Sequence, residues 1–254
     1  MNRLVAPSSA EQAALLLIEA RRTGTPIDDL PPHLQPSSQE DAHRIQNAMI
    51  DHYGPVGGWK TAAGGGPEPF LSPLPESLIT HQGLRLFPTR LPVVLVELEV
   101  ALMLNRDLPA LGQPYDAAAV RPAIASFHPL LELITFSWTD RDKVKRLTQL
   151  ADFQNSAGFV IGDAREDWHC FDPAGAACRL LLDDVEMAGD QPGAGLPSIL
   201  DTLAHLANHA IARGMPLCRG QVVTTGARLI ADASDVQMVR GEIEGLGSVY
   251  VSLA

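Results

Sequence analysis

Leu-Pro-Val-Val-Leu-Val-Glu-Leu-Glu-Val-Ala-Leu-Met-Leu, residues 91–104, is an almost unbroken apolar run that contains two acids. Its β-branched residues and its early proline predict a buried strand. Because successive side chains on a strand point to opposite faces, we expect Glu97 and Glu99 on the same face. Two buried carboxylates repel each other strongly unless a cation neutralises them. The stretch therefore predicts a strand that carries a cation-binding pair of acids.

A second apolar run, residues 129–135, carries one more acid, Glu132. Three carboxylates on strands favour a hard divalent cation, Mg²⁺ or Mn²⁺, with open positions for water and substrate. Calcium fits less well, because the sequence contains no loop with alternating Asp and Asn ligands. Two alternatives stay open from spacing alone. Either glutamate could face solvent on an edge strand, or it could pair with an arginine.

Composition predicts an ordinary globular protein without a nucleic-acid or membrane partner. The 254 residues suit one large or two small domains, and 46% hydrophobic with 19% charged residues is typical of folded chains. A formal net charge of -11 disfavours nucleic acid and anionic membranes as partners. The three cysteines lack the spacing of metal ligands, and residues 15–18 form too short an apolar core for a signal peptide. We therefore expect a cytoplasmic location.

Lys60 stands out because lysine is rare in this chain. The 19 basic residues comprise 16 arginines and only three lysines, Lys60, Lys143 and Lys145. Lysine can lose its proton when it is desolvated, whereas arginine stays protonated. Lys60 lies in the segment Gly-Gly-Trp-Lys-Thr-Ala-Ala, residues 57–63, and is a candidate proton carrier.

The pattern along the chain predicts a helical N-terminal arm, residues 1–54, followed by a β-rich catalytic body, residues 55–254. A capping box at residues 9–12 begins a helix that Gly24 stops, and Ser37 with Glu40 begins a second helix that Gly54 ends. Residues 64–67 are expected to form a flexible loop. Further helices are expected at 116–126, 140–153 and 199–213, and strands at 56–62, 91–104, 129–135, 158–162, 178–187, 221–225, 241–244 and 248–253.

Other candidate sites are weaker. His205 and His209 lie four apart on the helix expected from Ser198, which would suit a metal pair, but the pattern favours a solvated polar face. Lys60 follows glycines, yet no Gly-Lys-Ser/Thr sequence opens a helix there, which excludes a P-loop. The lack of a Gly-x-Ser-x-Gly elbow disfavours a serine hydrolase.

Val96–Leu102 resembles the Glu-x-Glu motif of the fumarylacetoacetate hydrolase superfamily. The whole chain resembles the hydratase/decarboxylase branch, which contains 2-oxopent-4-enoate hydratases and 4-oxalocrotonate decarboxylases. Six further segments carry this resemblance in the right order: Asp41–Gln46, Gly58–Lys60, Leu131–Leu133, Ala151–Asp152 with Asn155, Gly220–Gly226 and Ile243–Val249.

The resemblance implies an α+β fold with a mixed β-roll or sandwich core, and a homo-oligomer. It implies Mg²⁺ or Mn²⁺ and a substrate that is a short 2-oxo or 2-hydroxy-dienoic acid from aromatic-compound catabolism. It also implies a proton shuttle by Lys60, with the pKa of this lysine lowered by the cation. The implied site comprises the metal ligands Glu97, Glu99 and Glu132, the catalytic residues Lys60 and Asp152, and the substrate-binding residues Trp59, Asn155 and Thr225.

The chain also departs from the branch around the substrate. Ala62-Ala63 stands where a small hydroxyl residue is common, and residues 69–72 lack a common aspartate. Ser137-Trp138 replaces an arginine that often follows the third glutamate. The first expectation is a hydratase. The alternatives are a 2-oxo-acid decarboxylase, an acylpyruvate-type C–C hydrolase and a catalytically silent metal-binding partner subunit.

Overall fold

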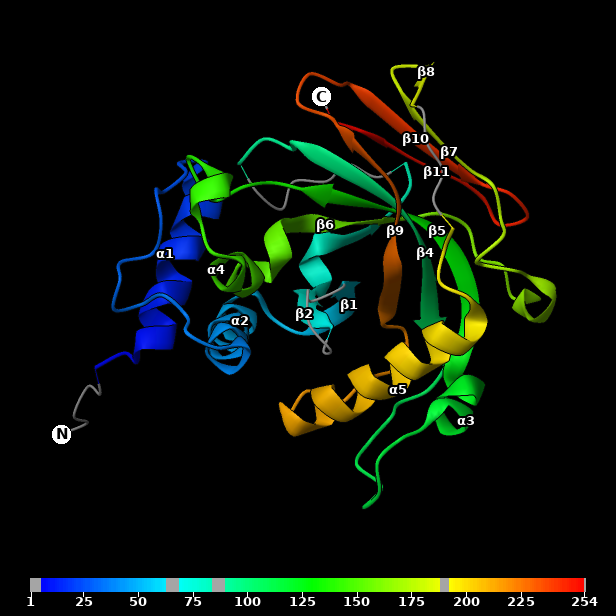
Figure 1. The fold of residues 1–254 in the computed structure, drawn as a ribbon, viewed down its shortest axis with the longest axis horizontal. Helices are drawn as coiled ribbons and strands as arrows, with labels where there is room; N and C mark the ends of the chain where they lie inside the picture. Colours follow the sequence, from blue (N-terminus) through cyan, green and yellow to red (C-terminus); the bar gives the residue numbers. More distant parts are fainter. Residues whose placement is uncertain (1–5, 63–68, 84–89, 188–191, 254) are drawn as a thin grey trace.

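The computed structural model describes residues 6–62, 69–83, 90–187 and 192–253. The apolar run that opens at Leu91 becomes strand β4, Leu95–Leu104, in the middle of a seven-stranded sheet. This sheet has the order β2-β1-β9-β4-β5-β6-β3 and is strongly curved (Figure 1). Its pairs are antiparallel except β1 with β9 and β3 with β6. The other strands are β1 Val56–Ala62, β2 Phe70–Pro75, β3 Ile79–His81, β5 Ile124–Ile134, β6 Ser156–Ile161 and β9 Val222–Asp232.

A smaller antiparallel sheet packs against one face of the large sheet. Its order is β11-β10-β7-β8, with β7 Cys178–Leu182, β8 Val185–Glu186, β10 Met238–Ile243 and β11 Gly247–Ser252. Leu98 of β4 and Leu131 of β5 share a core with the inner residues of the small sheet. The two sheets approach each other closely at Gly241, where an added Cβ would lie 2.4 Å from Leu98 Cδ1. Strand alternation therefore places Leu98 in the core between the sheets and leaves Glu97 and Glu99 on the opposite face.

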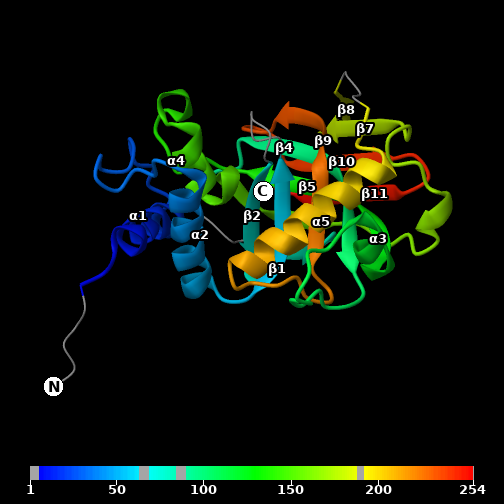
Figure 2. The same ribbon diagram turned by 60° about the horizontal axis from the view of Figure 1, so that its bottom comes forward.

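The helices cover the rest of the large sheet. Helices α1 Ser9–Thr23, α2 Gln39–Tyr53 and α4 Arg146–Ala151 pack on each other beside β2, and they share a second core with that strand. Helix α5, Leu196–Ala212, runs across the open side of the curved sheet and contacts α3, Ala117–Val120 (Figure 2). The predicted mixed α+β fold is thus confirmed. The division into arm and body at residue 54 stays a prediction.

Short 3₁₀ turns connect several of these elements. They are Glu76–Leu78, Arg121–Ala123, Arg141–Lys143, Phe153–Asn155 and Trp168–Cys170. Among the described residues, no helix has the length and hydropathy required to cross a membrane.

Some predicted boundaries were wrong. The capping box of α1 uses Ser8 and Glu11, one residue earlier than expected, and Ser38 rather than Ser37 caps α2. The helix expected at 116–126 ends at Val120, because the chain enters strand β5 at Ile124. The helix expected at 140–153 is a 3₁₀ turn followed by α4. Helix α5 begins at Leu196 after Gly195, before the expected Ser198. The loop expected at 64–67 lies outside the described residues.

Candidate metal centre

Three glutamates from two neighbouring strands meet on the cavity face of the large sheet. Glu97 of β4 lies directly opposite Glu132 of the antiparallel strand β5, and Glu99 follows two residues later on the same face. One carboxylate oxygen from each of the three lies within 4.8 Å of the others. Glu99 is 1% exposed and Glu132 is 0% exposed. The expected shared face is confirmed, and neither buried acid faces solvent.

The carboxylates differ in their other partners. Glu99 Oε2 accepts a hydrogen bond of 2.9 Å from the backbone N–H of Gly226 in β9. Register shifts between β4 and β9 on both sides of Glu99 free this N–H from the regular ladder. Both carboxylate oxygens of Glu132 are buried, and Oε1 lies 2.9 Å from the ammonium of Lys60. Such an anion requires a cation.

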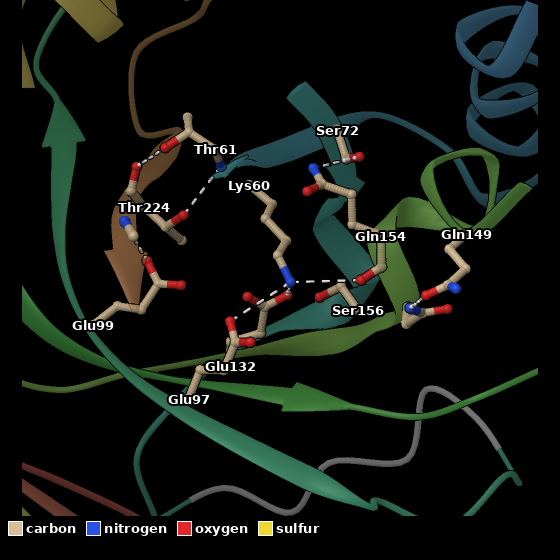
Figure 3. Close-up of polar contacts among 12 residues, drawn as sticks. Lys60, Thr61, Ser72, Glu97, Glu99, Glu132, Gln149, Gln154, Ser156 and Thr224 are labelled. Carbon is tan, nitrogen blue, oxygen red and sulfur yellow. Dashed lines mark hydrogen bonds and ion pairs between the residues drawn. The ribbon is translucent and has the colours of Figure 1, made fainter. Parts of the chain in front are cut away.

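Lys60 of β1 supplies positive charge to this cluster (Figure 3). Its Nζ lies 2.9 Å from Glu132 Oε1 and 3.7 Å from Glu97 Oε2 as ion pairs, and 3.5 Å from the carbonyl oxygen of Gln154. Burial lowers the pKa of Lys60, but the charges of Glu132 and Glu97 outweigh this effect, so the pKa lies above its ordinary value. The lowering of this pKa by a bound metal cation, which the resemblance implies, stays a prediction.

One lysine does not balance three carboxylates. Burial, followed by the charge of Glu97, raises the pKa of Glu99 to about 7. Burial also raises the pKa of Glu132 well above its ordinary value, despite Lys60. A divalent cation would restore the balance, and three convergent carboxylate oxygens are ligands that hard cations prefer. The three glutamates therefore fit a metal site.

The cluster opens into a cavity of about 1100 Å³. Phe70, Leu95, Ile134, Phe136 and Ile230 form apolar parts of its wall, while amides of Gln149, Gln154 and Asn155 and the side chain of Thr225 add polar groups. Arg141 and Arg146 also line the cavity. Their guanidinium carbons lie 5.0 Å from the ring centroid of Phe136 and 5.1 Å from that of Phe70. The cavity thus combines an acidic end with arginines that stack on aromatic rings.

Two expected substrate-binding residues lie in the cavity wall, and a third does not. Asn155 Oδ1 accepts from Trp138 Nε1, and its amide donates to Gln149 Oε1. Thr225 Oγ1 donates to the Val100 carbonyl, 2.7 Å away. Trp59 is 0% exposed and lies in the core rather than in the cavity wall. It precedes Lys60 on the strand, so its side chain points to the other face. The expectation for Trp59 was wrong.

Asp152, the second expected catalytic residue, is also absent from the cavity wall. It is 0% exposed, and its Oδ1 accepts a hydrogen bond of 2.7 Å from Arg21 Nε in helix α1. Asp152 thus forms a buried ion pair with Arg21, and its expected catalytic role stays a prediction. Spacing in the sequence gave no sign of this partner, which lies 131 residues away.

The sequence pattern also did not identify several residues that line the cavity. Arg141, Arg146 and Gln149 come from the segment predicted as one helix, and arginine is too common here to mark a site. Gln154 contributes its backbone carbonyl, which no side-chain motif encodes. Among the described residues, only the three glutamates form a metal-binding group of three or more, so His205 and His209 do not. His209 instead packs edge-on against the ring of His43.

Comparisons with known proteins agree with this geometry. No family model matches the sequence. The chain is 31% identical over 156 residues to a 2-keto-4-pentenoate hydratase of Burkholderia vietnamiensis, covering 61% of this chain and 58% of that protein. It thus spans less than two thirds of the hydratase's length.

The structural likeness extends further. The structure superposes on 4-oxalocrotonate decarboxylase from Pseudomonas putida G7, complexed with magnesium and adipate, with a TM-score of 0.81, 19% identity and 98% of both chains covered. Fumarylpyruvate hydrolase from Pseudomonas aeruginosa, in complex with Mn²⁺ and pyruvate, matches with a TM-score of 0.53 and 16% identity over 76% of this chain and 87% of that chain. The chain therefore has the fold of 4-oxalocrotonate decarboxylase, and its resemblance to the hydratase/decarboxylase branch of the fumarylacetoacetate hydrolase superfamily is confirmed.

Proposed function

We propose that this protein is a divalent-metal-dependent hydratase that adds water to a short 2-oxo-alkenoate, or to its 2-hydroxy-dienoate tautomer, during the breakdown of aromatic compounds. One observation carries the proposal: Lys60 Nζ lies 2.9 Å from Glu132 within the group of three glutamates at the cavity end. Sequence identity to 2-keto-4-pentenoate hydratase supports the substrate class.

The metal would be held by Glu97, Glu99 and Glu132. The complete burial of Glu132 and the raised pKa values of Glu132 and Glu99 support this assignment. We propose Mg²⁺ or Mn²⁺, because both suit all-oxygen ligands and occur in the two structural relatives described above. When bound, such a cation supplies the positive charge that stabilises the enolate of a 2-oxo acid.

Hydration forms one C–O bond and one C–H bond across a C=C bond, so a proton must pass from water to carbon. We propose that Lys60 carries this proton, and its position beside the acids in the cavity wall supports this role. Gln149, Gln154 and Asn155 line the same cavity with amide groups that orient water or the substrate carboxylate. The apolar wall around Phe70 and Phe136 suits the hydrocarbon part of the substrate.

A 2-oxo-acid decarboxylase is the second candidate, and the arginines favour it. Arg141 and Arg146 line the same cavity as Glu97 and Glu99, and they could pair with a second carboxylate on the substrate. 4-Oxalocrotonate, the substrate in the name of the structural relative, is a dicarboxylate. The same enolate chemistry would then release CO₂ in place of adding water.

Incubation of the protein and Mg²⁺ with a freshly generated 2-hydroxy-dienoate tests these assignments. Loss of the ultraviolet dienol band without CO₂ supports the hydratase. Stoichiometric CO₂ from 4-oxalocrotonate supports the decarboxylase, and cleavage of an acylpyruvate supports the C–C hydrolase. No turnover of any of the three substrates, with Mg²⁺ bound, contradicts enzymatic function and favours the silent subunit. The homo-oligomeric state and cytoplasmic location stay predictions.

A further inference from the structure

Three consecutive residues between helix α4 and strand β6 adopt left-handed backbone conformations. Phe153, Gln154 and Asn155 have φ values of 50°, 55° and 62°. Side chains with a Cβ rarely adopt this region, and a run of three non-glycine residues needs support from its surroundings. We call residues 153–155 the left-handed turn.

The left-handed turn forms part of the site. The Gln154 carbonyl is 3.5 Å from Lys60 Nζ (Figure 3). Gln154 and Asn155 also line the cavity. The ammonium of Lys60 contacts the carboxylates of Glu97 and Glu132, and the Gln154 carbonyl is an uncharged acceptor beside them. Its position therefore helps to set where the ammonium lies.

One buried guanidinium holds both ends of the turn. Arg21 Nε and Nη2 donate to Asp152 Oδ1 and to the Asp152 carbonyl, at 2.7 Å and 3.1 Å. Arg21 Nη1 donates to the Ser156 carbonyl at 2.8 Å. The contacts thus fall on the residues immediately before and after the turn. Arg21 is 2% exposed and Asp152 is 0% exposed, so water does not replace these bonds.

A second polar contact ties the turn to β2, the strand paired with the one that carries Lys60. Gln154 Nε2 donates to Ser72 Oγ at 2.9 Å, and Gln46 Nε2 donates to the same oxygen at 2.7 Å. Ser72 of β2 pairs with Lys60 of β1 in the sheet. The turn is therefore fixed to β2, the neighbour of the strand that carries Lys60, and, through Arg21, to the N-terminal helix α1.

We propose that Arg21 and Asp152 are positioning residues for Lys60. Arg21 holds the left-handed turn through the residues that flank it, Asp152 orients the guanidinium, and the turn presents the Gln154 carbonyl to Lys60 Nζ. Asp152 thus acts on the reaction through the turn and not by touching substrate. The kinetic part of this inference rests on the proposed function of Lys60, whereas its structural part does not.

The test uses Arg21→Lys and Asp152→Asn in the full-length protein. Arg21→Lys keeps a positive charge beside Asp152, but an ammonium cannot reproduce the planar fork that reaches both carbonyls. In Asp152→Asn, Arg21 keeps its hydrogen bonds to the Asp152 and Ser156 backbone carbonyls. Asp152→Asn should therefore displace Lys60 less than Arg21→Lys does. The matched control is Arg228→Lys, because Arg228 is 4% exposed and also donates to two backbone carbonyls, those of Pro173 and Ala176.

The first readout is the NMR resonance of Lys60 in protein labelled at lysine Cε with carbon-13. The chain has only three lysines, so Lys143 and Lys145 provide internal references, and Lys60→Arg assigns the third signal. We expect Arg21→Lys to shift the Lys60 signal alone, and Arg228→Lys to leave it in place. An unshifted Lys60 signal in folded Arg21→Lys overturns the proposal. If Arg21→Lys does not fold, Asp152→Asn decides by the same comparison.

The second readout is steady-state kinetics with the dienoate at saturating Mg²⁺. Misplacing a reacting group by about 1 Å costs up to about 10²-fold in rate, so kcat should fall by about 10- to 10²-fold in Arg21→Lys. KM and Mn²⁺ affinity should change by less than about twofold, since the ligands are untouched. Equal losses in kcat, KM and metal affinity overturn the positioning role. A parent protein without turnover refutes the proposed function. The Lys60 resonance still tests whether Arg21 and Asp152 position Lys60.

Discussion

Replacing Glu132 by glutamine separates the metal-binding role of the cluster from its role in folding. Side-chain oxygens of the three glutamates lie within 4.8 Å of each other. With an effective dielectric constant of about 20, each charged pair then repels by about 3.5 kcal/mol or more. Lys60, 2.9 Å from Glu132, attracts it by about 6 kcal/mol on the same scale. The two repulsions on a charged Glu132 together slightly exceed this attraction, before its burial is counted.

Glu132→Gln should therefore leave the metal-free protein as stable as the parent at pH 8, or more stable by about 1 kcal/mol. For a chain of this size that corresponds to about 2–4 °C in Tm. Mn²⁺ affinity should fall by more than about 10²-fold, because loss of groups that merely orient ligands already costs about 10–10²-fold. Mn²⁺ should raise the Tm of the parent and leave that of the variant unchanged.

The assay is calorimetric titration with Mn²⁺, combined with thermal melts in chelator and in Mn²⁺. Glu166→Gln is the matched control, since it removes the same charge from an exposed side chain. Unchanged Mn²⁺ affinity in both Glu132→Gln and Glu97→Gln would refute the metal assignment. A drop in Tm of more than about 5 °C in metal-free Glu132→Gln would refute the charge balance.

Three further predictions concern the lysine, the pH dependence and the backbone. Lys60→Arg should lower kcat by about 10²–10⁴-fold if the lysine transfers a proton, whereas a variant near the parent rate would show that the lysine only holds charge. The pKa of Glu99 is raised to about 7, and metal binding requires the ionised carboxylate. Mn²⁺ affinity should therefore fall by up to about tenfold per pH unit below about pH 7. An Mn²⁺ affinity that stays constant from pH 8 to 5.5 contradicts this prediction. Gly158→Ala should destabilise by about 2 kcal/mol or more, because Gly158 has φ 150° and the new Cβ would lie 2.4 Å from the Leu78 carbonyl oxygen. Gly214 has φ 75° and no neighbouring atom where a Cβ would lie, so Gly214→Ala measures the backbone strain alone. An equal loss of unfolding free energy in Gly158→Ala and Gly214→Ala would exclude a contribution from the clash with Leu78.

The parts of the site that follow from local pattern were predictable. Glu97 and Glu99 share a face because strand alternation is a property of the backbone, and Glu132 followed from a second apolar run with one acid. The same alternation could have excluded Trp59, since a neighbour of Lys60 on a strand must point away from it. A resemblance over a segment carries no information about which strand face each of its residues occupies.

Contacts between distant residues were not predictable. The Arg21–Asp152 pair joins helix α1 to the end of α4, and neither residue has a local motif that reveals the other. The left-handed turn was invisible for a related reason: Phe153, Gln154 and Asn155 include no glycine, which is the usual signal of positive φ. Tertiary contacts impose this conformation, so the sequence pattern predicted only a helix that ends at residue 153.

The position of β9 has a consequence for the order in which the protein can assemble during synthesis. β9 lies between β1, which carries Lys60, and β4, which carries Glu97 and Glu99. Its parallel pairing joins Gly58 to Val222, so the two halves of the site cannot be bridged until more than 160 residues after β1 have been made. At about 5–20 residues per second the ribosome needs about 8–30 s for that interval. During this time the glutamates of β4 and β5 can pair with each other, but they lack the Gly226 N–H and the strand that aligns Lys60. The nascent chain therefore carries an acidic half-site, and the complete centre forms only in the last stage of folding.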